Sequence, residues 1–153
     1  MNKFNFFNDF LFLKFISKTK FFMKKSILKN FKKAIKNNID YIQITNPTAE
    51  QDNYFRAIGK TVSIIKLANK YNLPILHRNA STHIRYLCYE LNLDCPKLYS
   101  FREVLEKPIL RGLRMILVDE IISIEEIEKI KKQNPMIKIV GFARINKNKI
   151  NNN

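Results

Sequence analysis

Apolar residues recur at helical spacing in several separate stretches of the chain. From about Met23 they fall on one face of a helix with lysines opposite, and the pattern changes after Asn38. A second helix is predicted over residues 60–71, because Asn72 and Pro74 end the apolar repeat. A third helix is predicted to follow Asn79, which can serve as its N-terminal cap. Capping boxes predict two more, and these boxes pair Ser100 with Glu103 and Ser123 with Glu126.

Short apolar runs without helical spacing separate these helices. One alternates in the manner of a strand, and the others are continuously apolar, as in strands buried on both faces. From residue 60 onward such strands alternate with helices, which predicts an α/β domain with a mostly parallel central sheet between two helical layers. The predicted strands are residues 41–45, 73–77, 97–101, 115–118 and 137–140.

The composition is that of a globular protein of one domain. Of the 153 residues 46% are hydrophobic and 27% charged, which excludes a wholly disordered chain, a collagen and a coiled-coil rod. No run approaches the roughly 18 apolar residues of a membrane span, and no small-residue cleavage site follows the apolar start. Two cysteines cannot staple a domain of this size, so we expect reduced thiols and a cytoplasmic protein.

The chain carries a strong basic excess that is unevenly distributed. Its net charge is +15, and the first 36 residues hold ten lysines against one acid, Asp9. Two explanations are open: selection for nucleic acid as a partner, or adenine- and thymine-rich codons, since Asn, Lys, Ile and Phe supply 73 of the 153 residues. We expect residues 1–36 to form a basic extension, residues 37–145 the domain, and residues 146–153 a disordered tail. Residues 1–22 are either an upstream segment without a folded role or an arm for nucleic acid or an anionic membrane.

Two short motifs carry the candidate chemistry. Gly59-Lys60-Thr61 opens the helix predicted over residues 60–71, and Asp119-Glu120 follows the apolar strand 115–118. A phosphate-binding loop needs a glycine so that backbone amides can face the phosphates, a lysine that reaches them, and a Ser or Thr hydroxyl that coordinates Mg²⁺. An acid at the end of an apolar strand can hold the same ion, and a second acid beside it can polarise the attacking water.

With these motifs, residues 54–144 resemble the P-loop NTPases, in particular RecA-like helicase motors and small phage ATP-binding proteins. Residues 56–61 are similar to the end of Walker A, and residues 115–120 to Walker B. The resemblance implies a cytoplasmic protein that binds ATP with Mg²⁺ and could hydrolyse it slowly. Lys60 and Glu120 would be catalytic, and Thr61 and Asp119 would hold the metal. The nucleotide would contact Arg56, Ala57, Ile58, Gly59, Lys60, Thr61, Val62 and Arg144, the last as a sensor of the γ-phosphate.

The Walker A stretch departs from the family pattern at its start. Tyr54 stands where the first glycine is expected, and Phe55 adds bulk to a loop that needs small residues. A second hypothesis therefore stays open, namely a basic nucleic-acid-binding accessory protein that keeps the fold without turnover. Whether the base is adenine or guanine also stays open.

Other titratable residues give weaker signals. The spacing of His77, His83, Cys88 and Cys95 matches no common zinc pattern. Cys88 lies on an apolar helix face, where a core role is expected. Arg111 and Arg114 are expected on the surface.

Overall fold

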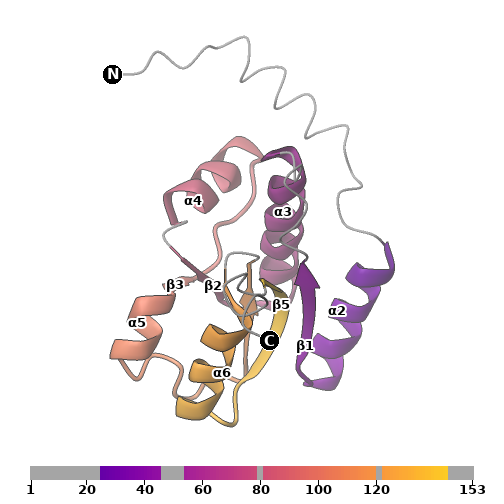
Figure 1. The fold of residues 1–153 in the computed structure, drawn as a ribbon. Helices are drawn as coiled ribbons and strands as arrows, with labels where there is room; N and C mark the ends of the chain where they lie inside the picture. Colours follow the sequence, from indigo (N-terminus) through magenta and orange to yellow (C-terminus); the bar gives the residue numbers. More distant parts are fainter. Residues whose placement is uncertain (1–24, 46–53, 79–80, 120–121, 145–153) are drawn as a thin grey trace, which may run out of the picture.

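The computed structural model describes residues 25–45, 54–78, 81–119 and 122–144 (Figure 1). Its centre is a parallel five-stranded sheet in the order β1-β5-β4-β2-β3. This arrangement confirms the predicted α/β class with a parallel sheet. The strands are β1 (Tyr41–Thr45), β2 (Ile75–His77), β3 (Leu98–Ser100), β4 (Met115–Val118) and β5 (Lys138–Arg144).

The strands lie where the apolar runs predict them, and β5 is longer than expected. It continues through Arg144 because it pairs with β1 on one side and with β4 on the other. Each added residue therefore gains a backbone partner, which an apolar run of four residues could not indicate.

Five helices accompany the sheet in the described part of the chain. Both predicted capping boxes are present, with Ser100 and Ser123 each accepting a backbone N–H from the glutamate three residues later. Asn72 and Asn92 adopt positive φ at the ends of two helices, where asparagine tolerates the left-handed conformation. The bounds are α2 (Lys25–Asn37), α3 (Tyr54–Tyr71), α4 (Ser81–Glu90), α5 (Phe101–Glu106) and α6 (Ile124–Gln133). The predicted cap Asn79 lies outside the described residues.

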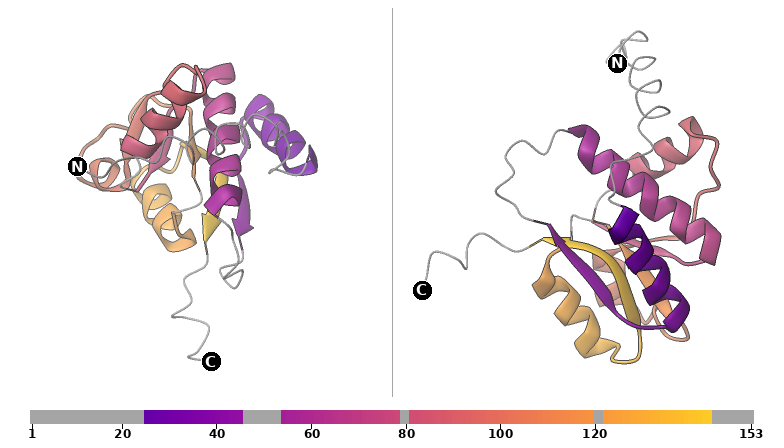
Figure 2. Two further views of the ribbon diagram at one scale, coloured as in Figure 1. Left: turned by 90° about the horizontal axis from the view of Figure 1, so that it is seen from above. Right: turned by 90° about the vertical axis from the view of Figure 1, so that its right-hand side faces the viewer.

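The helices form two layers, one on each face of the sheet (Figure 2). Alternate residues of β4 supply both cores: Met115 and Leu117 pack with α2, α3 and α4, whereas Ile116 and Val118 pack with α5 and α6. All four of these side chains are buried. Burial of β4 on both faces explains its continuous apolar sequence.

Helix α2 belongs to the packed domain. Its side chains Phe31, Ala34 and Ile35 are at most 1% exposed. Phe31 meets Phe142 of β5 edge to face at 5.1 Å between ring centroids. The domain therefore begins before the boundary at residue 37 that the sequence predicts, because the helical repeat of α2 is a core face. Residues 1–24 and 145–153 lie outside the described part.

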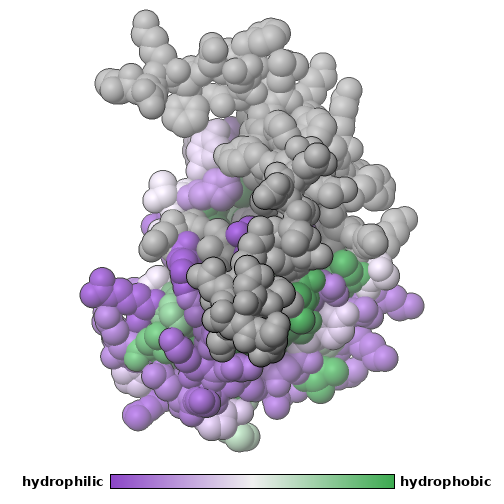
Figure 3. All heavy atoms as spheres, in the orientation of Figure 1, coloured by the Kyte–Doolittle hydropathy of each residue, from purple (hydrophilic) through white to green (hydrophobic). Residues whose placement is uncertain are grey.

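The face of the domain seen in Figure 3 is mostly polar. Figure 3 shows hydrophilic side chains over most of the coloured face, with apolar ones in small separate groups. None of the helices among the described residues combines the length and the apolar character needed to cross a membrane.

Strand β5 approaches β4 closely at a glycine. Gly141 has φ +148°, and a Cβ atom built there would lie 2.1 Å from the carbonyl oxygen of Val118. Val118 directly precedes Asp119, so this contact fixes the backbone at the end of β4. Glycine is needed here for both its conformation and its lack of a side chain.

We expect Gly141→Ala to lower the free energy of unfolding by about 2–4 kcal/mol, because a backbone clash adds to the strained φ. Gly112→Ala is the control, since Gly112 has φ +79° but no atom within 4 Å of its built Cβ. It should cost only about 1 kcal/mol. Urea unfolding of both variants measures the difference, and equal losses would contradict the close approach.

Candidate functional site

The carboxyl ends of the three central strands carry polar residues. Arg144 ends β5, Asp119 directly follows β4, and His77 ends β2. Side chains alternate along a strand, and each of these three shares the parity of core residues that face α2, α3 and α4. All three are therefore expected to point toward the helical layer that contains α3.

Asp119 and Thr61 meet across this edge. The Thr61 hydroxyl, on α3, donates a hydrogen bond to Asp119 Oδ2 at 3.0 Å. Thr61 is 6% exposed and Asp119 5%, so the pair is buried. The sequence predicts that these two residues, 58 positions apart, hold one metal ion, and the structure brings them into direct contact.

The backbone holds Asp119 from two directions. Its N–H donates to the carbonyl of Leu76 in β2 at 3.4 Å, and its own carbonyl accepts from Ile122 at 3.3 Å. The carboxylate is thus placed by the sheet on one side and by the turn before α6 on the other. Glu120, the residue expected to polarise water, lies outside the described residues.

Lys60 lies next to this pair on α3 and is half-buried. Its Nζ stands 5.6 Å from the ring centroid of Phe142, near the carboxyl end of β5. A cation over an aromatic face is weakly attracted to it, so the ring holds the lysine close to the strand ends. Val62, the next residue after Thr61, is also half-buried and packs against the core.

The start of α3 differs from the sequence prediction. The helix begins at Tyr54, not after Gly59, since residues 54–58 contain neither glycine nor proline and one glycine is tolerated inside a helix. Thr61 is therefore about 10 Å from the helix start, at 1.5 Å per residue. The amides of Gly59, Lys60 and Thr61 lie inside the helix, where carbonyls of the preceding turn take them. Residues 56–58 are helical, and their side chains lie outside the described part.

Arg144 is exposed at the end of β5. Its N–H donates to the carbonyl of Ile122 at 2.9 Å, which ties the strand end to the turn after Asp119. The residue expected as phosphate sensor thus lies on the strand next to Asp119, with its backbone held.

His77 is a further polar residue at the carboxyl ends of the strands, although its sequence signal is weak. It is 4% exposed and lies on the strand beside Asp119. Burial lowers the pKa of its imidazole below 6.5, Glu103 acts in the opposite direction, and Arg85 lowers it further. A neutral imidazole is therefore expected at neutral pH. The sequence signal that could have indicated His77 is its position as a polar residue at the end of the apolar strand 73–77.

A topological feature marks the same place. Strand β4 leads into α6 in one layer, while its neighbour β2 leads into α4 in the other. In open parallel sheets, ligands bind outside the carboxyl ends of strands at such a point. Asp119 and His77 flank it.

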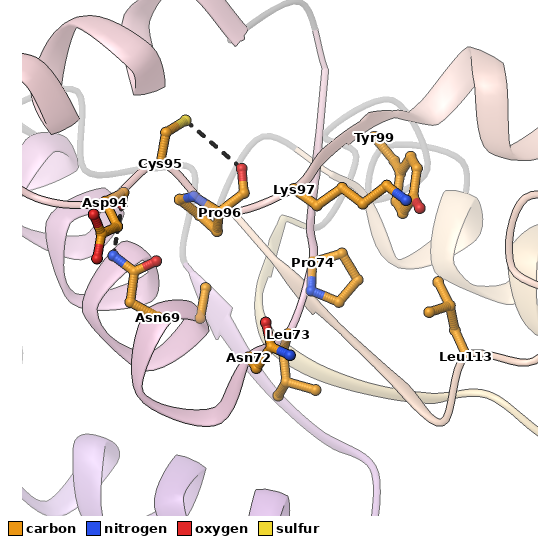
Figure 4. A pocket seen from close by; sticks show the side chains of 11 residues that line it. Asn69, Asn72, Leu73, Pro74, Asp94, Cys95, Pro96, Lys97, Tyr99 and Leu113 are labelled. Carbon is orange, nitrogen blue, oxygen red and sulfur yellow. Dashed lines mark hydrogen bonds between the residues drawn. The ribbon is translucent and has the colours of Figure 1, made fainter.

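A hollow of about 450 Å³ lies at the amino ends of the strands, opposite the carboxyl ends that carry Asp119 and His77 (Figure 4). It is lined by Pro74, Lys97 and Leu113, which stand at the amino ends of β2, β3 and β4. The Asn69 side chain donates to the carbonyl of Asp94 at 2.6 Å and closes one side. We do not place the site there, because it contains none of the paired polar groups of the carboxyl edge.

Cys88 and the remaining arginines lie where the sequence predicts them, in the core and on the surface respectively. Cys88 is buried, as predicted, and burial together with the neighbouring Cys95 raises the pKa of its thiol to about 12. Arg111 and Arg114 are exposed and precede β4, at the amino edge. Within the described ranges no three His, Cys, Asp or Glu side chains gather as a metal site.

Comparison of the chain with protein-family models, curated proteins and solved structures finds no match.

The low pKa of His77 makes the stability of the domain depend on pH. The unfolded chain binds a proton near pH 6.5 and the folded chain only at lower pH, so stability should fall as pH drops below 6.5. The slope is at most about 1.4 kcal/mol per pH unit. His77→Gln should remove this part of the slope in urea unfolding between pH 7.5 and 5.5, with His83→Gln as the control. A slope unchanged by His77→Gln would contradict the assignment.

Proposed function

We propose that this protein binds a nucleoside triphosphate as its Mg²⁺ complex at the carboxyl edge of the sheet. The observation that carries the proposal is the buried hydrogen bond between Thr61 Oγ1 and Asp119 Oδ2 at 3.0 Å. It joins the last residue of the Gly-Lys-Thr motif to the first acid of the Asp-Glu motif, as a shared metal ion would require.

The donor set fits the ion. Mg²⁺ prefers oxygen ligands, and in nucleotide sites it takes one or two of them from the protein and the others from phosphates and water. The hydroxyl of Thr61 and the carboxylate of Asp119 are such oxygens, already adjacent and held by the backbone. Bound Mg²⁺ would neutralise charge on the phosphate oxygens.

Three cationic or polar residues on α3 and on the strands beside Asp119 would bind the rest of the ligand. Lys60 would leave the Phe142 ring and reach the phosphates, and Arg144 would contact the terminal phosphate. His77, neutral and buried beside Asp119, would donate or accept a hydrogen bond without adding charge. Hydrolysis would further require Glu120 to take a proton from water, so the proposal is binding first and turnover second.

Phosphate binding requires a change at the start of α3. The amides of Gly59 to Thr61 can face a phosphate only if residues 54–58 leave the helix, so that it begins at Gly59. Binding would then favour the unwound form. The free energy needed to unwind residues 54–58 would reduce the apparent affinity for the nucleotide. Tyr54 and Phe55, which replace the usual small residues, make that form less accessible.

Thermal-shift titration with Mg-ATP and Mg-GTP tests the proposal. A ligand at 100 times its Kd should stabilise the native state by about 2.7 kcal/mol, roughly 5–10 °C in Tm for a domain of this size.

Lys60→Ala should weaken binding at least tenfold, because a charge-assisted contact contributes about 1.5–3 kcal/mol. The exposed Lys129 on α6 provides the control Lys129→Ala. Equal affinity of the folded Lys60→Ala variant and the wild type would overturn the site.

A second variant tests the unwinding of α3. Ala57→Gly weakens the helical form of residues 54–58 by about 1 kcal/mol while leaving Gly59, Lys60 and Thr61 unchanged. If binding requires unwinding, the apparent affinity for Mg-ATP should rise up to about fivefold. Isothermal titration calorimetry measures it, and an affinity that stays constant or falls would show that the helical start is retained in the complex.

A further inference from the structure

The two helical layers differ in charge. Helices α2, α3 and α4 contain ten basic residues and one acid, Glu90, a net charge of +9. Helices α5 and α6 contain four basic residues and five acids, a net charge of −1. The layers face opposite sides of the sheet, so the domain has one strongly basic side (Figure 2).

Codon composition does not explain this difference. Basic residues are about as frequent in both layers, as a general bias toward lysine would produce, with ten in 41 positions and four in 16. The layers differ in their acids, which are almost excluded from α2, α3 and α4. A bias in lysine codons cannot remove acids from one side only.

Five exposed basic side chains of the α2–α4 layer make no ion pair with a described residue, whereas the α5–α6 layer contains ion pairs. In the α5–α6 layer, Arg102 pairs with Glu106, and Lys131 pairs with Asp40 at 3.0 Å. The exposed side chains Lys29, Lys33, Lys36, Lys66 and Arg85 make no ion pair with any residue that the structure describes. Their charge is therefore not neutralised by an ion pair with any described residue.

The spacing suits a polyanion. Lys29, Lys33 and Lys36 follow one another at i, i+4 and i+7 on α2, so neighbours are about one turn or 5–6 Å apart. Lys66 and Lys70 form a second such row on α3, which packs beside α2. A duplex presents one phosphate charge per about 1.7 Å of axis, and it can meet both rows at once.

We propose that the α2–α3 surface, with exposed lysines 29, 33, 36, 66 and 70, binds the phosphate backbone of nucleic acid without reading its sequence. A membrane is a poorer partner, because surface-binding helices insert large apolar side chains. The exposed large apolar residues of the described part are Ile39, Ile44, Tyr89 and Met136, none of them on α2 or α3. No aromatic ring is among the exposed large apolar side chains of the described part of α2 and α3, so phosphates, not bases, are the expected contact.

The proposal does not depend on the nucleotide site, since none of the five lysines belongs to it. Fluorescence anisotropy with a labelled 20-base-pair DNA duplex, in the absence of nucleotide and with the full chain, tests it. The wild type should bind with an affinity that falls steeply between 50 and 200 mM salt. Lys33→Gln/Lys66→Gln should weaken binding about tenfold or more at 100 mM salt and reduce the slope of log K against log salt by about two.

Lys129→Gln/Lys132→Gln on α6 is the matched control, because both lysines are exposed and the net charge changes equally. Circular dichroism and Tm verify that both variants are folded. The proposal is overturned if the control weakens binding as much, or if the wild type does not bind the duplex at 50 mM salt. It is also overturned if the wild type binds phosphatidylserine vesicles but no duplex, or if two unrelated duplex sequences differ more than tenfold in affinity.

Discussion

Burial of β4 on both faces is the constraint on which the rest of the domain depends. A strand with four consecutive apolar side chains has to be covered on both faces, because adjacent side chains point to opposite faces, and here two helical layers cover it. Met115 and Leu117 need α2, α3 and α4, and Ile116 and Val118 need α5 and α6. The neighbouring strands must be parallel and joined by helices, so every strand ends at the same edge. The position of the candidate site follows from this arrangement.

At that edge the sheet itself places the chemistry. Gly141 lets β5 approach the backbone of Val118, and the N–H of Asp119 bonds to Leu76 of β2. The carboxylate is held from both neighbouring strands before any ligand arrives, and it then meets the Thr61 hydroxyl. When side chains are already ordered before binding, less of the binding free energy is lost in ordering them. The start of α3 is the opposite case, since residues 54–58 have to change conformation before phosphate can approach the backbone.

Helix α3 connects the two proposed activities. Lys60 and Thr61 are near its start, at the sheet edge, and Lys66 and Lys70 point outward along the same helix. A nucleotide that shortens α3 would therefore act on the helix that carries part of the basic surface. The outward lysines belong to the turns beyond Thr61, whose inner faces are packed by Ile64, Ile65 and Ala68. These turns are expected to stay in place while the start of the helix changes.

The sequence alone determined the fold class, because local patterns carry it. Strand positions, the two capping boxes and the helix end at Asn72 depend on residues within a few positions of each other, so they could be predicted. The pairing of Thr61 with Asp119 was predictable only because each belongs to a known motif. The start of α3 was predicted wrongly, because a glycine was taken as a boundary where the helix continues through it.

Only the tertiary structure decided which residues share a surface. The order β1-β5-β4-β2-β3 places His77 beside Asp119, although 41 residues lie between them, and no local pattern encodes that neighbour. The grouping of acids in one layer is likewise invisible along the chain, since α4 and α5 follow each other in sequence but lie on opposite faces. Local hydrophobic and capping patterns determine each element, whereas long-range strand pairing and burial determine which elements meet.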